Sequence, residues 1–360
     1  ALCGAVAQAF TGSRKASGYL FNSPTEMRRR SKFNPQPAQN VIDFGFADEQ
    51  LERPSLTAPL PSQRRSPYPL IDGESGGAES EKDSVSPRFF KFMSFGSGSY
   101  LGSERGGILI DAGVKSEYVE SQLRSAGISM DEVKGILLTH DHSDHIQYVY
   151  RLLRAHKHLA LFCTNRVMNG LMQRHNISKR VRDYHTPIYK EIPFKVLDFE
   201  ITAFEVPHDG TDNMGFSIVM GNRHFVFATD MGAVSSRALH YIQQAHFLVV
   251  EANYDLEMLL NGRYPDYLKA RIRTPYGHMD NSNTAALLAK VAGHGLKYVW
   301  LCHLSRDNNM PEKALATVRQ GLENAGFTVG SDAETTKDRD ADLILTALPR
   351  FDATRLYVLR

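Results

Sequence analysis

Cysteine is scarce in this 360-residue chain, where only Cys3, Cys163 and Cys302 occur and no CxxC pair exists. Three scattered cysteines cannot build a disulfide framework, so we expect a reducing, cytoplasmic setting. Cys302 precedes His303, but neighbours on a strand point to opposite faces. We therefore interpret Cys302 as a buried thiol rather than a metal ligand.

Long apolar runs and an excess of charge of one sign are also missing. No run approaches the about 20 apolar residues that a helix needs to cross a bilayer, so we expect no membrane partner. The formal net charge is +2, and any basic surface must therefore be local. The apolar opening ALCGAVAQAF has no basic stretch before it. We expect it to be a tail feature rather than a signal peptide.

Proline is unevenly distributed, because nine of the sixteen prolines fall within residues 1–87. The same segment contains RRRSK, SQRRSPYP and DGESGGAESEKDS. Such a composition buries too little apolar surface to offset the entropy of ordering. We predict a Pro/Ser/Arg-rich, disordered extension over residues 1–87 and one folded domain over residues 88–360.

The second segment alternates patterns typical of strands and helices. Strand patterns occupy 89–95, 106–113, 133–140, 159–163, 199–208, 215–222, 224–230, 245–253 and 296–304. Helical spacing occurs at 116–127, 145–156, 283–294 and 311–326. Strands in the middle, with helices between and at both ends, predict an α/β sandwich with sheets inside and helices outside.

Residues 139–146 read THDHSDHI and follow the apolar run Gly135 to Leu138. Imidazole and carboxylate groups are ligands that Zn²⁺ accepts and Mn²⁺ tolerates. The alternative is a polar loop that happens to be rich in histidine. The cluster consists of His140, His142, Asp144 and His145.

Three more metal-binding side chains end apolar runs farther along the chain. His208 follows FEVP, Asp230 follows FVFAT, and His303 follows YVWLC. Each alone is compatible with a capping aspartate or an edge histidine. Together with the THDHSDHI cluster they predict a metal site at the rim of a sheet.

The series that begins with Asp111 in LIDAG resembles the five motifs of the metallo-β-lactamase-fold hydrolases. The resemblance covers the chain after residue 88 and implies an αββα sandwich, in which two mixed β-sheets are flanked by helices. It implies two divalent ions, Zn²⁺ or Mn²⁺, with Asp111 orienting a ligand. The implied ligands are His140, His142 and His208 for one ion, Asp144, His145 and His303 for the other, and Asp230 as the bridge.

Further motifs resemble the YycJ/WalJ branch of that superfamily. They are NYDLEMLLNGRYPDYLKARI, GHMDN, HLSRDNN and the first hairpin SFGSGSYLGSE. The branch usually has a longer turn after GSGS, with a Gly-Asn-Cys stretch that is absent here. The resemblance implies a metal-dependent 5′-exonuclease that acts on double-stranded DNA and is associated with repair.

The resemblance, which extends to tRNase Z, also implies catalytic roles for Asp144, His278 and Glu251. Asp144 would accept a proton from a metal-activated water, the nucleophile. His278 would protonate the leaving oxygen, and Glu251 would keep the imidazole of His278 oriented and protonated. The alternatives are a loop histidine before a helix and a carboxylate that caps a turn.

A nucleic-acid substrate, DNA ends in our prediction, requires a basic approach to the site. Lys269, Arg271 and Arg273 lie in the segment before His278 and are candidates for phosphate contacts. The alternative for these residues is a solvated helix face. Two other functions remain open: another hydrolase of the same fold, such as an RNA endonuclease or a thioester or lactone hydrolase, and a non-catalytic metal-containing DNA-binding protein.

Overall fold

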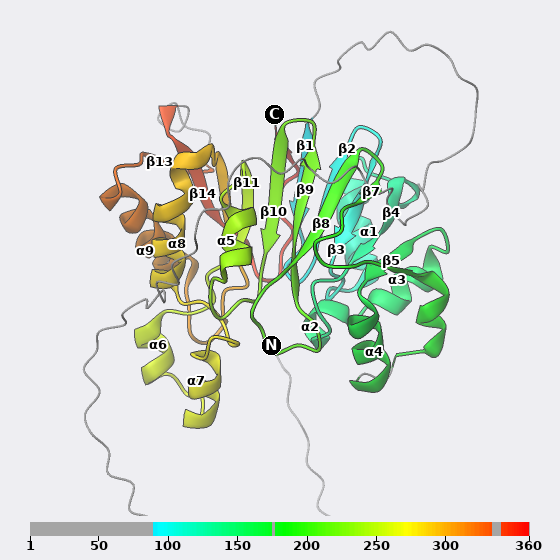
Figure 1. Ribbon diagram of the computed structural model, residues 1–360, viewed down its shortest axis with the longest axis horizontal. Coiled ribbons are helices and arrows are strands. Elements are labelled where there is room, and N and C mark those ends of the chain that lie inside the picture. Colours follow the sequence, from blue (N-terminus) through cyan, green and yellow to red (C-terminus); the bar gives the residue numbers. More distant parts are fainter. Residues whose placement is uncertain (1–88, 175–176, 333–339, 360) are drawn as a thin grey trace, which may run out of the picture. The chain divides into compact units, whose positions relative to one another are not determined.

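Two β-sheets and the helices outside them make up the computed structural model (Figure 1). The structure describes residues 89–174, 177–332 and 340–359. The predicted disordered extension 1–87 and the apolar opening lie outside the described residues, so the division at residue 88 stays a prediction. The predicted fold class, two mixed sheets flanked by helices, is confirmed.

The first sheet has seven strands in the order β15-β1-β2-β3-β4-β5-β6. These strands are β1 Phe90–Ser94, β2 Ser99–Ser103, β3 Gly106–Ile110, β4 Val133–Leu137, β5 Ala160–Cys163, β6 His185–Pro187 and β15 Tyr357–Leu359. The second sheet has eight strands in the order β13-β14-β12-β11-β10-β9-β8-β7. They are β7 Phe194–Val196, β8 Phe199–Glu205, β9 Met214–Met220, β10 Arg223–Ala228, β11 Phe247–Glu251, β12 Tyr298–Cys302, β13 Val329–Gly330 and β14 Leu343–Ala347.

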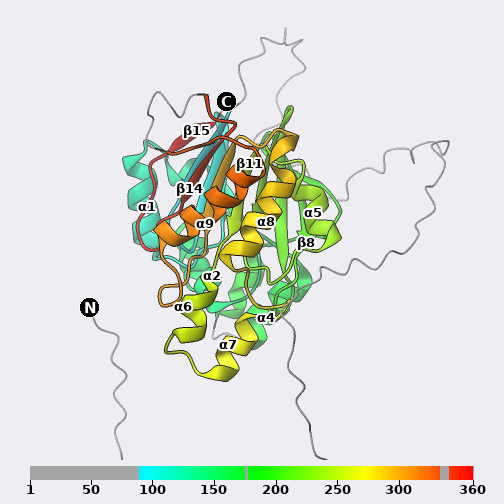
Figure 2. The same ribbon diagram turned by 90° about the vertical axis from the view of Figure 1, so that its left-hand side faces the viewer.

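The helices form outer layers. They are α1 Ser116–Ser125, α2 Ser143–Ile146, α3 Val149–Ala155, α4 Asn165–Arg174, α5 Ser236–Ile242, α6 Leu256–Asn261, α7 Asp266–Ile272, α8 Asn281–Val291 and α9 Pro311–Asn324. Short 3₁₀ helices span Met130–Glu132, Lys179–Tyr184 and Ala292–His294. Helices α5, α8 and α9 cover the second sheet, and α6 and α7 lie beyond one end of the α8–α9 layer (Figure 2).

Side chains of β10 alternate between two apolar layers, as the period of a strand requires. Phe225 and Phe227 pack between the two sheets, whereas Val226 and Ala228 pack under the outer helices. The layer between the sheets is rich in aromatic rings. Phe92 of the first sheet lies with its ring centroid 4.6 Å from that of Trp300 in the second. The buried, alternating strands therefore hold the two sheets face to face.

A further strand, β2, lies between the first two predicted strands, in a region to which the sequence analysis assigned no strand. β2 pairs with β3, and Gly102 lies opposite Gly107. The ring of Tyr100 occupies the space that a Cβ atom would take at either glycine. The two glycines thus leave room for the buried tyrosine ring to pack across the hairpin.

The prediction of one continuous helix over 145–156 is wrong. The structure has α2 at Ser143–Ile146 and α3 at Val149–Ala155, with a break between them. Backbone bonds from the segment after β3 cause the break, because Tyr148 N donates to Ala112 O at 2.9 Å and Ala112 N donates to His145 O at 2.8 Å. These bonds tie the end of α2 and the start of α3 to the segment after β3.

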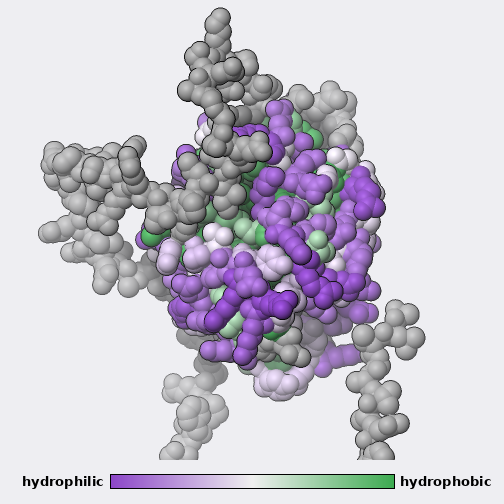
Figure 3. All heavy atoms as spheres, turned by 90° about the vertical axis from the view of Figure 1, so that its right-hand side faces the viewer, coloured by the Kyte–Doolittle hydropathy of each residue, from purple (hydrophilic) through white to green (hydrophobic). Residues whose placement is uncertain are grey.

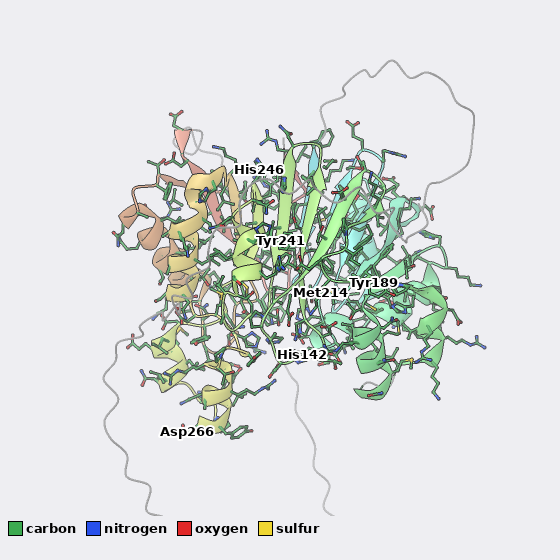
Figure 4. All side chains as sticks on the ribbon, in the orientation of Figure 1. His142, Tyr189, Met214, Tyr241, His246 and Asp266 are labelled. Carbon is green, nitrogen blue, oxygen red and sulfur yellow. The ribbon has the colours of Figure 1, made fainter. Side chains whose placement is uncertain are left out.

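Carboxyl ends of parallel strands meet at one rim of each sheet. β10, β11, β12 and β14 are parallel neighbours in the second sheet, and β3 and β4 are parallel neighbours in the first. His142, which follows β4, lies at the same end of the sheets as Asp266 at the start of α7. His246, which precedes β11, lies at the opposite end (Figure 4). Ligand sites of α/β sheets form outside such carboxyl ends.

The face that carries α3 and α4 is mainly hydrophilic, as expected for the outer side of a helical layer (Figure 3). Among the described residues, no helix combines the length and the apolar character that a bilayer crossing requires.

Candidate metal centre

Three residues of the predicted site have left-handed backbone conformations at strand ends. Asp111 follows β3 with φ of 59°, Asp230 lies just beyond β10 with φ of 50°, and His303 follows β12 with φ of 54°. Residues other than glycine rarely adopt this backbone conformation, and those that do cluster at functional sites. The sharp turns aim three polar side chains at a single rim of the sandwich.

The first group of candidate ligands consists of His140, His142, His208 and Asp230. Nε2 of His208 lies 3.2 Å from His142 Nδ1 and 3.7 Å from Asp230 Oδ2. His140 Nε2 lies 3.7 Å from the same oxygen of Asp230. One ligand atom from each of these four residues lies within 4.8 Å of every other, a spacing that can hold a metal ion.

The second group consists of Asp144, His145 and His303, whose ligand atoms also lie within 4.8 Å of one another. Asp144 Oδ2 lies 3.6 Å from Nε2 of both histidines. Asp230 stands between the two groups, because its Oδ2 lies 3.5 Å from His145 Nε2. The structure thus brings together all seven side chains that the sequence nominated as ligands.

Polar partners hold the Nδ1 atoms of three of these histidines. Asp111 Oδ2 lies 2.8 Å from His145 Nδ1, Gly277 O lies 2.9 Å from His208 Nδ1, and Glu251 Oε1 lies 2.8 Å from His303 Nδ1. A partner on one ring nitrogen fixes the tautomer and leaves the other nitrogen for a metal. The Nε2 atoms of these rings are therefore presented to the centre.

The chemistry of the donor set fits a divalent cation. Nε2 of both His140 and His145 is buried and has no hydrogen-bond partner within the described part of the chain. Such unpaired buried nitrogens are costly unless another group satisfies them. Burial, and then the nearby His145, lower the pKa of His140 well below its ordinary value. These effects favour the neutral ring of His140, which is the form that binds metal.

The contact between Asp111 and His145 can be tested by substitution. The carboxylate of Asp111 accepts from Thr139 N at 2.9 Å and from Thr139 Oγ1 at 2.8 Å, and it faces His145 Nδ1. We expect Asp111→Asn to lower zinc affinity by about 10- to 100-fold, since the neutral amide makes His145 a weaker ligand. Competition with a chromophoric chelator measures the affinity. Asp131→Asn, at an exposed aspartate, is the control, and equal affinities for both variants would contradict the role of Asp111.

Glu251 and His278 form a pair beside this centre. Glu251 is fully buried, and its Oε1 lies 2.7 Å from His278 Nδ1. Burial disfavours protonation of His278, but the charge and hydrogen bond of Glu251 outweigh it and raise the pKa of His278. Glu251, His278 and His303 also lie within ligand distance of Asp230. The pair can therefore serve as a proton donor or contribute to a metal site.

Asp209, which the sequence analysis did not single out, lies between the centre and α7. Its Oδ1 lies 3.4 Å from His142 Nε2, and its Oδ2 lies 2.6 Å from Nη2 of Arg271. The only sequence signal is its position directly after His208.

The three predicted basic contacts lie in different surroundings. Lys269 Nζ donates to Leu260 O at 2.7 Å, Arg273 is exposed, and Arg271 is hydrogen-bonded to Asp209.

A pocket of about 700 Å³ opens over the centre. Asp144, His145, His278 and His303 line it together with Arg271. Gly113 also borders it, at a point where a Cβ atom would overlap the carbonyl oxygen of Asp144. A cavity with convergent polar groups and titratable side chains is the expected form of a small-molecule or nucleotide site.

Comparisons with known proteins agree on a family. Residues 107–303 match the family described as beta-lactamase superfamily domain. The chain is 36% identical over 236 residues to exodeoxyribonuclease YycJ of Bacillus anthracis, an alignment that covers 65% of this chain and 88% of that protein. Exodeoxyribonuclease WalJ of Streptococcus pneumoniae is 31% identical over 249 residues, which cover 68% of this chain and 92% of WalJ.

The solved structures agree on the fold. The metallo-beta-lactamase fold protein YhfI from Bacillus subtilis superposes with a TM-score of 0.53 at 15% sequence identity. The superposition covers 74% of this chain and 99% of that protein. At this level of identity the likeness concerns the arrangement of strands and helices alone.

Proposed function

The chain belongs to the beta-lactamase superfamily domain family and is a metal-dependent hydrolase, and from this premise we propose that it is a two-metal 5′-exonuclease that acts on double-stranded DNA. The resemblance inferred from the motifs is confirmed at the level of the family and of its YycJ/WalJ branch. Both named relatives are exodeoxyribonucleases, which supports a nucleic-acid substrate for this chain.

The observation that carries the proposal is the contact of 2.7 Å between Glu251 Oε1 and His278 Nδ1 beside the candidate ligands. The ring centroid of His278 lies 5.0 Å from that of His208 and 5.1 Å from that of His303. Cleavage of a phosphodiester expels an alkoxide, which needs a proton. A histidine kept protonated by a buried carboxylate, next to a metal centre, supplies that proton.

We propose two divalent ions, zinc or manganese, in this centre. His140, His142 and His208 would hold one ion, Asp144, His145 and His303 the other, and Asp230 would reach both. The chemistry that such a pair supplies is the acidification of a water and the neutralisation of charge on the phosphoryl oxygens. Asp111 would keep the ring of His145 in place through its contact of 2.8 Å.

The protein's own residues would then handle the protons. Burial raises the pKa of Asp144, but the hydrogen bond and charge of His303 and the charge of His145 outweigh it and keep the carboxylate ionised. We propose that ionised Asp144 binds the metal and that one of its carboxylate oxygens accepts a proton from the attacking water. Glu251 holds Nδ1 of His278, so His278 Nε2 is the atom that donates to the leaving oxygen.

Basic residues of α7 and of the position that follows it would contact the DNA backbone. Arg271 lines the pocket and is held by Asp209, so we propose that it binds a phosphate near the cut. Arg273 is exposed and would contact a phosphate farther away. We assign Lys269 a weaker contact, because its ammonium group already donates to the backbone of α6. We also propose a cytoplasmic location, which suits the free thiols of Cys163 and Cys302.

End-labelled single- and double-stranded DNA and RNA, incubated with the full chain and Mn²⁺, Zn²⁺ or EDTA, test the proposal. We expect nucleotides to be released from the 5′ ends of duplex DNA. We expect EDTA to abolish this release and added metal to restore it, because the nucleophile depends on the cations. Sizing the products by gel electrophoresis measures both.

Each other outcome points to a different function. Internal cuts in RNA would indicate an endonuclease of the same fold. Hydrolysis of thioesters or lactones without any nucleic-acid product would indicate a small-molecule enzyme. Binding of duplex DNA that resists chelators and yields no product would indicate a non-catalytic binding protein.

A further inference from the structure

One wall of the pocket takes no part in the chemistry described above. Arg306, Arg350 and Phe351 line it, and we call these three residues the basic–aromatic wall. Arg306 lies in the loop that begins with His303 after β12. Arg350 and Phe351 follow β14, which pairs with β12. The wall and the candidate metal ligands therefore border one cavity.

The two arginines of the wall are not bound directly by an acidic group among the described residues, although the nearby charge of Asp307 acts on Arg350. Across the described ranges, neither guanidinium has a carboxylate oxygen within 4.0 Å. Arg350 Nε donates to Leu304 O at 2.9 Å, which fixes this side chain against the loop of His303. Burial, and then the like charge of Arg306, lower the pKa of Arg350. Two neighbouring guanidiniums beside a cavity form a binding site for phosphate.

Phe351 adds an aromatic surface to these charges. Its side chain is 67% exposed although it borders the pocket, and Arg350 Cζ lies 5.7 Å from its ring centroid. The loop that carries the ring is held in place, because Thr354 N donates to Ser94 O at 2.9 Å. Ala353 N also donates to the hydroxyl of Tyr118, at 2.8 Å. An exposed ring on a fixed loop is preorganised to stack on a nucleobase.

We propose that the basic–aromatic wall binds the nucleotide next to the scissile bond, with Arg306 and Arg350 on its phosphate and Phe351 stacked on its base. This inference rests on the proposed nuclease function and specifies how the same pocket recognises its substrate. A base inside a duplex is covered on both faces by its neighbours, so it can stack on a side chain only at the end of the duplex or after it has left the stack. The wall therefore binds a base at the end of the duplex or in an unpaired stretch.

The stacking is tested by removing a base from the DNA and the ring of Phe351 from the protein, singly and together. Duplexes that carry one abasic nucleotide at the first, second or third position are compared with the intact duplex, for the wild type and for Phe351→Ala. At one position, we expect the abasic substrate to raise the wild-type KM by about 5- to 150-fold, the range expected for one stacked base. We expect Phe351→Ala to raise KM equally on the intact duplex and to be insensitive to the abasic site.

Two further substitutions separate stacking from mere bulk. Phe351→Trp should keep the wild-type KM, whereas Phe351→Leu, which stays apolar but lacks an aromatic face, should behave like alanine. kcat should change little in all three variants, as expected when a contact is equal in ground and transition states. Tyr189→Ala, at an aromatic residue that is 47% exposed outside the pocket lining, is the matched control.

Salt dependence tests the arginines. Arg306→Gln should flatten the slope of log KM against log salt by about 0.7 to 0.9, the value for one lost phosphate contact. Arg124→Gln, at an exposed arginine of α1, should leave that slope unchanged. A merely structural role of Arg306 would raise KM without altering the slope.

Failure of this inference differs from failure of the nuclease function. If the wild type degrades DNA while the effects of Phe351→Ala and of the abasic sites simply multiply, or are absent, the stacking role is wrong and the nuclease function stands. An unchanged salt slope for Arg306→Gln would remove the phosphate contact. If the wild type degrades no nucleic acid, both the inference and the proposed function are wrong.

Discussion

Alanine in place of His278 is expected to lower kcat on duplex DNA by about 100- to 10,000-fold, the range typical of a lost general acid. The reason is the pairing of His278 Nδ1 with buried Glu251, which keeps the imidazole protonated and oriented. Bound metal, measured by elemental analysis, should stay the same. Retention of metal matters because His278 also lies within ligand distance of Asp230 and His303.

A modified substrate isolates the proton transfer. Sulfur in place of the bridging leaving oxygen departs without a proton, so a general acid contributes little to its release. The defect of His278→Ala should therefore shrink strongly on the sulfur-containing duplex. His240→Ala, at a histidine in the last turn of α5, is the control and should be normal on both substrates.

Two results would contradict the proton-donor role. An equal defect on the oxygen and sulfur substrates would place His278 in binding or positioning instead. Loss of one metal equivalent from His278→Ala would make it a ligand, in line with its proximity to Asp230 and His303.

The candidate ligands could be predicted from sequence because the geometry of a sheet places them. His140, His208, Asp230 and His303 each follow an apolar run, and the carboxyl ends of strands that run in the same direction meet at one rim. β8, which precedes His208, runs in the direction of β10 because β9 pairs antiparallel with both. The apolar runs also gave most strands of the second sheet, because their side chains alternate between two buried layers. Local pattern and global fold agree at these positions.

Features that depend on contacts between distant segments were not predictable in the same way. The partner of Asp209 is Arg271, 62 positions away, and no local pattern connects a loop aspartate with the exposed face of α7. Phe351 follows the last strand of its sheet, in a segment of turn-like composition, and only the fold brings it to the pocket. The break between α2 and α3 likewise results from tertiary bonds to Ala112 rather than from a helix-breaking residue.

Asp230→Asn is expected to lower metal affinity by more than about 100-fold. This exceeds the range for losing a residue that only hydrogen-bonds to a ligand, because Asp230 would bind the metal itself. Asp230 is 2% exposed and, like His303, belongs to two of the three candidate ligand groups among the described residues. Its Oδ2 also lies 3.5 Å from Nε2 of His145, in the group that does not include it. Asparagine keeps the size of the side chain but removes the negative charge. We expect metal content to fall and DNA cleavage to fall with it, as measured by elemental analysis and by the gel assay on one preparation.

The matched control is Asp212→Asn, which replaces a second buried aspartate. Asp212 accepts from Thr164 Oγ1 at 2.7 Å, and Lys190 Nζ lies 2.6 Å from its Oδ1, so it stabilises the loop that follows His208 through partners that are not candidate ligands. Its substitution should lower the melting temperature yet leave metal stoichiometry unchanged. If Asp230→Asn instead retained the full metal content at wild-type affinity, the two candidate sites would not share this carboxylate. A two-metal centre bridged by Asp230 would then be wrong, whatever the substrate.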